Sequence, residues 1–199
     1  MVQSLKDGFR QKFLGGLDLF FLFGRGMAAF DGTRVAALRS LAIPIGILLF
    51  NLVYHSFWPY PPKGMEVGYS SRQIMGTVVV HTLLGFGLTT AFSWLVLCLL
   101  GKKERFWLLF TATNWTGLAG SVVTFPLSIM ATLALAPREV MDRVFVILML
   151  YTLFVAACIV QRGLGVNWPL AIGIAIGAFC INNELWHVVY AVQGIPIPW

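Results

Sequence analysis

Five long apolar runs occupy most of this 199-residue chain, and they constrain its fold more than any other feature of the sequence. A run of about 20 apolar residues is long enough to cross the roughly 30 Å hydrocarbon core of a membrane as an α-helix. Charged or turn-forming residues separate the runs, which places their boundaries to within about four residues. The expected spans are residues 40–58, 74–100, 106–134, 140–161 and 167–192.

These runs place the chain among integral membrane proteins. Apolar residues make up 58% of the sequence and charged residues only 11%, whereas about a quarter of the residues in a soluble domain are charged. A membrane interior offers no water to backbone groups, so a spanning chain forms helices or a closed barrel, and runs of this length indicate helices. We expect an all-α, polytopic membrane helical bundle with five transmembrane helices at residues 40–199, preceded by an amphipathic interfacial segment at residues 1–39.

The segment before the first span has the pattern of an amphipathic helix. Large apolar residues recur there at helical spacing among basic ones, namely Phe9, Phe13, Leu17, Phe20 and Phe21. Such a helix binds a membrane interface through apolar burial and through attraction to anionic lipid. A helix packed under the bundle or against a partner protein explains the same pattern, and both alternatives stay open at this point.

Lysine and arginine residues are unevenly divided between the two ends of the predicted spans. If the N-terminus is cytoplasmic, ten of them lie on the cytoplasmic side: Lys6, Arg10, Lys12, Arg25, Arg34, Arg39, Lys102, Lys103, Arg105 and Arg162. Four lie on the other side: Lys63, Arg72, Arg138 and Arg143. Because cytoplasmic loops carry an excess of these residues, we expect a cytoplasmic N-terminus and an external C-terminus. The short loops and the lack of a targeting segment favour the inner membrane of a bacterium.

Two spans carry stripes of small and polar residues at alternating spacings of three and four. In the fifth span the stripe comprises Gly173, Gly177, Cys180, Glu184, His187 and Ala191. In the third span it comprises Asn114, Gly117, Ser121, Thr124 and Ser128. Small residues at this spacing allow helices to approach closely in a membrane. We therefore predict that Gly173 and Gly177 pack against one neighbouring helix, and Gly117 and Ser121 against another.

The few ionisable side chains within the spans are expected at a similar depth. Counted from Trp168 at 1.5 Å per residue, Glu184 lies about 24 Å into the slab, and His55, counted from Ser40, lies about 22 Å into it. His81 falls in the outer third as well. The candidate polar or ion site therefore comprises Glu184, His187, His81, His55, Asn183 and Asn51.

Three interpretations of this polar site remain open. A metal or redox centre is one, because imidazole and carboxylate groups bind transition metals, and Glu184 and His187 share a helix face. A transporter is the second, since an acid within a span is a functional candidate by default. The third is a cluster of buried, hydrogen-bonded polar side chains that fixes how the helices pack. A carboxylate-bridged di-iron site needs two Glu-x-x-His motifs, and this chain has one. The metal therefore stays unknown, and no cofactor is favoured.

Several functional classes are not expected. The chain has no GxSxG, Walker A or HExxH motif and no paired carboxylates outside the spans, so the sequence favours a non-enzymatic protein, while an enzyme that acts within the membrane stays an open alternative. Its net charge of +6 forms no basic patch interleaved with aromatic residues, so no nucleic-acid partner is expected. Three cysteines without CxxC spacing do not indicate a disulfide framework or a zinc site.

The five spans, the amphipathic lead-in and the entry stretch FDGTRVAALRS (30–40) together resemble the Yip1-type group of five-span membrane proteins. The resemblance implies a non-enzymatic role, because eukaryotic members act in membrane trafficking and organelle shaping, and it supplies no catalytic residues. We expect a non-catalytic accessory or scaffolding subunit, and its partners to be membrane lipids and other integral membrane proteins or further copies of itself. The alternative is a small transporter or a metal-binding redox protein centred on Glu184 and His187.

Overall fold

The computed structural model describes residues 2–57, 71–132, 135 and 137–192, and its regular structure within these ranges is entirely helical. The all-α prediction is therefore confirmed for this part of the chain. The elements are α1 (Val2–Phe20), η1 (Gly24–Ala29), α2 (Arg34–Ser40), α3 (Ala42–Phe57), α4 (Ser71–Leu99), η2 (Lys103–Arg105), α5 (Phe106–Thr132), α6 (Arg138–Leu164) and α7 (Trp168–Val192).

Four stretches of helix are long and apolar enough to cross a membrane. They are Arg34–Tyr54, Met75–Leu99, Glu139–Leu164 and Trp168–Val192, and they correspond to four of the five predicted spans. The first begins earlier than predicted, because α2 and α3 follow each other with only Leu41 between them. The third predicted span forms the 27-residue helix α5, which is not among the four. Its asparagine, threonines and serines lower its apolar character.

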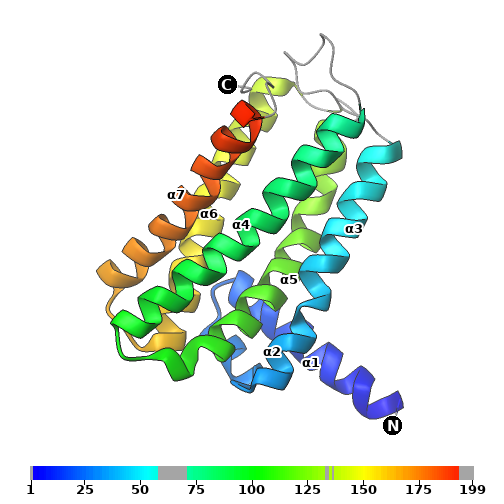
Figure 1. The fold of residues 1–199 in the computed structure, drawn as a ribbon. Coiled ribbons are helices and arrows are strands. Elements are labelled where there is room, and N and C mark those ends of the chain that lie inside the picture. The colour runs from blue at the N-terminus through cyan, green and yellow to red at the C-terminus, as the bar shows by residue number, and fades with distance from the viewer. Residues whose placement is uncertain (1, 58–70, 133–134, 136, 193–199) are drawn as a thin grey trace.

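The five long helices α3 to α7 lie side by side in one bundle (Figure 1). Helix α7 packs against α4 and α6, while α5 packs against α1, α2, α3, α4 and α6 and so forms the centre of the bundle. The N-terminal end of α1 and the C-terminal end of α7 lie at opposite ends of the bundle (Figure 1). A helix surrounded by other helices needs less apolar surface than one that faces lipid, which accounts for the composition of α5.

The second half of α1 is packed tightly into the bundle. A Cβ atom added at Gly16 would lie 2.5 Å from the carbonyl oxygen of Trp115, so the two helices are almost in backbone contact. The Tyr151 hydroxyl donates a 2.5 Å hydrogen bond to the carbonyl oxygen of Phe20, and Leu19 is completely buried. Among the two alternatives for this segment, these contacts favour a helix packed against the bundle.

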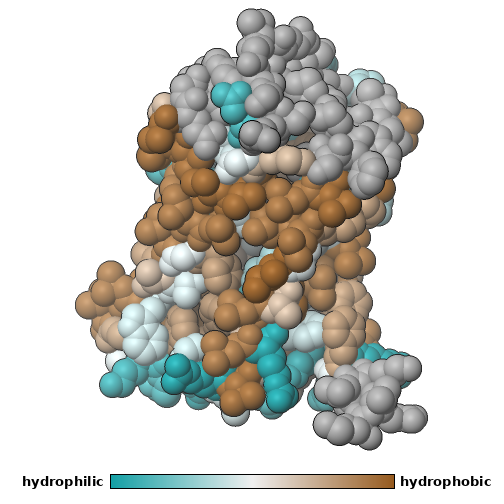
Figure 2. All heavy atoms as spheres, turned by 45° about the vertical axis from the view of Figure 1, so that its right-hand side comes forward, coloured by the Kyte–Doolittle hydropathy of each residue, from teal (hydrophilic) through white to brown (hydrophobic). Residues whose placement is uncertain are grey.

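The surface of the bundle is apolar, whereas part of its interior is polar. Figure 2 shows a broad hydrophobic band around the middle of the visible face, with hydrophilic side chains gathered at its lower end. The buried polar residues are Ser40, Thr77, His81, Thr111, Asn114 and Thr116. Apolar side chains exposed in the isolated chain, such as Leu95, Ile147 and Val188, are suited to contact lipid. This distribution is compatible with a multi-pass membrane protein.

Candidate functional site

The fifth-span stripe is not the face that α7 buries within the chain. Glu184 and Asn183 are exposed, and His187 is partly buried. The buried face is formed instead by Ala171, Ala175, Leu185 and Val189. The prediction that Glu184 continues the face packed within the bundle is therefore wrong. The predicted stripe and the buried face repeat at the same spacing along α7. They are offset by two positions, which is about 200° around a helix. Periodicity alone therefore does not tell which of the two faces is buried.

The predicted packing residues behave differently from one another. A Cβ atom added at Gly177 would lie 2.8 Å from the Phe92 ring on α4, so this glycine does allow a close approach. At Gly173 and at Gly117 an added Cβ atom would meet nothing within 4 Å, so neither position is a close helix contact within the described chain. Ser121 is partly buried on α5.

Among the side chains that the structure describes, His81 is a buried histidine, and it joins α4 to α7. Its ring stacks on Trp186 with centroids 3.5 Å apart, and its Nε2 atom lies 3.2 Å from the carbonyl oxygen of Asn182. Gly85 lies one turn further along α4, and a Cβ atom added there would lie 2.8 Å from the amide oxygen of Asn182. The lack of a side chain at Gly85 therefore leaves room for this amide. Thr77, His81 and Gly85 follow one another at intervals of four residues along α4 and are all buried, so they form a packing face of this helix.

The remaining predicted site residues are not brought together around Glu184. His81 contacts the side of α7 that carries Asn182 and Trp186, two positions away from Glu184 and so on the opposite side of that helix. Asn51 is partly buried on α3, a helix that packs against α2, α4 and α5. The side chain of His55 lies outside the described part of the structure. Within the described ranges, no three His, Cys, Asp or Glu residues are grouped so that they could hold a metal.

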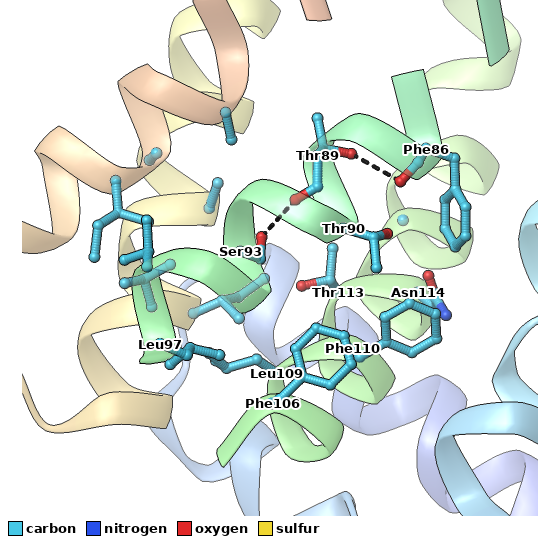
Figure 3. A pocket seen from close by; sticks show the side chains of 18 of the residues that line it. Phe86, Thr89, Thr90, Ser93, Leu97, Phe106, Leu109, Phe110, Thr113 and Asn114 are labelled. Atoms are coloured by element: carbon cyan, nitrogen blue, oxygen red, sulfur yellow. Dashed lines mark hydrogen bonds between the residues drawn. The ribbon is translucent and has the colours of Figure 1, made fainter. Parts of the chain in front are cut away.

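A cavity of about 370 Å³ lies at the centre of the bundle, lined by all five long helices. Figure 3 shows its polar side chains on two helices that face each other: Thr89, Thr90 and Ser93 on α4, and Thr113 and Asn114 on α5. The rest of the lining is apolar and includes three phenylalanines. Asn114 and Gly117 belong to the predicted third-span stripe, but the stripe gave no indication that these residues would border a hollow.

Asn114 anchors one end of this cavity. Its amide nitrogen Nδ2 donates a 2.8 Å hydrogen bond to the hydroxyl oxygen of Ser40, and this hydroxyl donates a 2.7 Å hydrogen bond to the carbonyl oxygen of Ala37. All three residues are buried. The chain of hydrogen bonds holds the elbow between α2 and α3 against the middle of α5, and it fixes the orientation of the Asn114 amide.

No protein-family model, curated protein or solved structure shows a significant match to this chain. Its function is therefore inferred from its residues and their geometry.

Proposed function

We propose that this protein is a non-catalytic accessory or scaffolding subunit of a membrane, and that it binds another integral membrane protein through the outward face of α7. The observation that supports this most is the exposure of Glu184 and Asn183 on a helix long and apolar enough to span a membrane. A charge within the slab costs at least about 2.5–3.5 kcal/mol unless it is solvated or paired. A partner that supplies hydrogen bonds or a positive charge removes this cost.

The same face offers space for a neighbouring helix. A Cβ atom added at Gly173 would meet nothing within 4 Å, and Cys180 is exposed seven residues further along the same face. Small side chains at this spacing let a second backbone approach closely, which is how helices associate in lipid. The exposed part of the stripe, which includes Gly173, Cys180 and Glu184, is thus suited to pack between chains. The Yip1-type resemblance implies a role of the same non-enzymatic kind.

The proposal includes α5 as a fifth membrane span. Helix α4 ends at Leu99, close in sequence to the start of α5, and α6 begins at Arg138, soon after the end of α5. If α4 and α6 cross the membrane in the same direction, α5 must return the chain between them. Five crossings also agree with the opposite placement of the two terminal helix ends in Figure 1. The excess of basic residues then favours an N-terminus in the bacterial cytoplasm and a C-terminus outside.

The decisive experiment is to measure the mass of the native particle. The full chain is extracted from its own membrane in mild detergent, and the mass, the other proteins and the metal content are determined on one sample. We expect a particle larger than one chain, with a second protein in fixed ratio. A particle that contains this chain alone, with bound metal, would overturn the proposal in favour of a site centred on Glu184 and His187.

Two substitutions test whether the outward face of α7 makes the contact. Glu184→Gln and Gly173→Leu should each reduce the amount of partner recovered with the chain, while the chain itself remains folded. Gly46→Leu is the matched control, because Gly46 is also an exposed helical glycine with nothing within 4 Å of an added Cβ atom, but it lies on α3. Equal loss of partner with all three variants would contradict a specific role for α7.

A further inference from the structure

We propose that the central cavity binds an uncharged, membrane-soluble molecule that has an apolar body and a hydroxyl or carbonyl head. Its volume of about 370 Å³ falls within the range of small-molecule pockets, roughly 300–1,000 Å³. An apolar cavity of about 150 Å³ already holds benzene, so this one accommodates a substituted ring or an alkyl chain of moderate length. The inference does not depend on the proposed partner at α7.

The lining determines the kind of body that fits. Phe86, Phe106 and Phe110 contribute aromatic surface, and aliphatic side chains from α3, α6 and α7 complete the wall. Phe110 packs edge-on against Phe86 with ring centroids 5.7 Å apart, and it lies equally far from Phe106. Aromatic and aliphatic walls of this kind suit an apolar body, either a flat ring or an alkyl chain.

The lining also excludes a charged head. None of the described residues around the cavity is charged. A carboxylate, phosphate or ammonium group placed there would lose its hydration without gaining an opposite charge, which costs far more than burying a neutral polar group. The polar lining consists of hydroxyl groups and one amide, and these suit a neutral hydroxyl or carbonyl.

The hydrogen-bonding groups divide into occupied and available ones. The hydroxyls of Thr89 and Ser93 donate to carbonyl oxygens of their own helix, at 2.6 Å and 2.8 Å. The hydroxyls of Thr90 and Thr113 form no hydrogen bond with the described residues, although both border the cavity. Asn114 is 8% exposed and uses its nitrogen for Ser40, which leaves its oxygen Oδ1 as an acceptor. Figure 3 shows Thr90 on α4 opposite Thr113 and Asn114 on α5.

These groups can form hydrogen bonds with a neutral polar head of the ligand from both α4 and α5. The two threonine hydroxyls can donate to a ligand carbonyl, and Asn114 Oδ1 can accept from a ligand hydroxyl. Threonines in membrane helices commonly bond to their own backbone, as Thr89 does, so two unbonded hydroxyls beside one cavity are a specific feature. The head is thus expected between α4 and α5, and the body against the phenylalanines.

The position of the opening indicates how the ligand enters. Thr113 and Gly117 border the cavity and are both exposed in the isolated chain, which favours an opening beside them. Gly117 lies 11 residues after Phe106, which is about 16 Å along α5 and near the middle of a 30 Å slab. An opening at this depth faces lipid, so the ligand reaches it from within the bilayer.

Binding can be tested on the purified full chain with matched probes. Native mass spectrometry would measure the bound fraction of a decyl-substituted benzoquinone, of 1-dodecanol and of dodecanoate, which differs from dodecanol by its charged head. We expect one quinone or one dodecanol per chain and at least tenfold weaker binding of dodecanoate. The stronger of the two neutral probes identifies whether a carbonyl or a hydroxyl head is preferred. Equal binding of dodecanoate, or no binding of either neutral probe, would overturn the proposal.

Two kinds of variant locate the bound molecule. Gly117→Leu extends a side chain toward the cavity from a position where an added Cβ atom meets nothing within 4 Å, so it should abolish binding without unfolding the chain. Gly87→Leu, an exposed and equally open glycine of α4 outside the cavity, should leave binding unchanged. The double variant Thr90→Val with Thr113→Val keeps side-chain shape and should weaken quinone binding roughly tenfold. Unaltered quinone binding by both cavity variants would show that the probe lies elsewhere.

Discussion

Single atoms decide how closely α1 approaches the bundle. The hydrogen of Gly16 faces the backbone of α5, and a carbonyl oxygen cannot move away as a flexible side chain can. Gly15 is similarly restricted, because an added Cβ atom would lie 2.4 Å from Ala29 in η1. Consecutive glycines therefore let α1 pack on two neighbours at once.

Gly16→Ala should lower the stability of the protein by about 1–3 kcal/mol, because its methyl group would overlap the carbonyl of Trp115. Gly8→Ala is the matched control in the same helix, since an added Cβ atom there meets nothing within 4 Å. Alanine is the better helix former, so the control should be neutral or slightly stabilising. Thermal unfolding in detergent measures both, and equal midpoints would contradict the close contact.

Thr116 is a buried residue whose hydroxyl has no hydrogen-bond partner in the described structure. Thr116→Val removes this uncompensated group and keeps the shape, so it should raise stability by about 1 kcal/mol. Thr111→Val is the comparison, because the Thr111 hydroxyl donates to the Trp107 carbonyl at 2.8 Å. It should be neutral or destabilising. A lower unfolding midpoint for Thr116→Val would show that its hydroxyl does have a partner.

At the scale of elements, the apolar runs predicted where helices lie but not which way they face. Four predicted spans coincide with long apolar helices, since length and hydropathy are local properties. The orientation of α7 depends on what its neighbours present, such as Phe92 against Gly177 and His81 against Trp186. The cavity is harder still to predict, because it is a space left between five helices and no single run encodes it.

Cysteine labelling tests the orientation of α7 and its proposed partner together. Cys180 and Cys98 are exposed, whereas Cys158 is buried on α6. In the purified chain, N-ethylmaleimide should modify Cys180 and Cys98 but leave Cys158 largely unmodified, as peptide mass spectrometry would show. In native membranes Cys180 should be labelled less than in lipid vesicles that contain the purified chain alone, because the partner covers it there, while Cys98 on α4 should react equally in both. Equal labelling of Cys180 in both samples would contradict a partner on this face.

At the scale of the whole molecule, α1, η2 and the ends of α4 and α6 gather at one end of the bundle (Figure 1). Basic residues are concentrated there: Lys102 donates a hydrogen bond to the carbonyl oxygen of Leu164, and Arg25 pairs with Asp18 at 2.9 Å. The hydrogen bond and the charge of Asp18 raise the pKa of Arg25 above its usual value, so this residue stays positively charged at physiological pH. This end is the one that we assign to the cytoplasm.

The assignment predicts which end of the bundle an impermeant reagent reaches. A cysteine introduced by Lys103→Cys, at an exposed position of η2, should react with a charged maleimide only after the cells are permeabilised. Glu139→Cys, exposed in the first turn of α6 at the opposite end, should react in intact cells. Both variants are made in a background without the native cysteines. The reverse pattern would invert the proposed topology.

The bond between Tyr151 and Phe20 also sets an order for biosynthesis. Its two residues are 131 positions apart in sequence, and α1 packs on α5 and α6 as well as on the nearby η1. At about 5–20 residues per second, a ribosome needs roughly 7–26 s to add this length of chain. During that interval the first helix exists without its complete packing surface. The nascent protein therefore depends on a temporary host for α1, whether lipid, insertase or chaperone, until its sixth helix has been made.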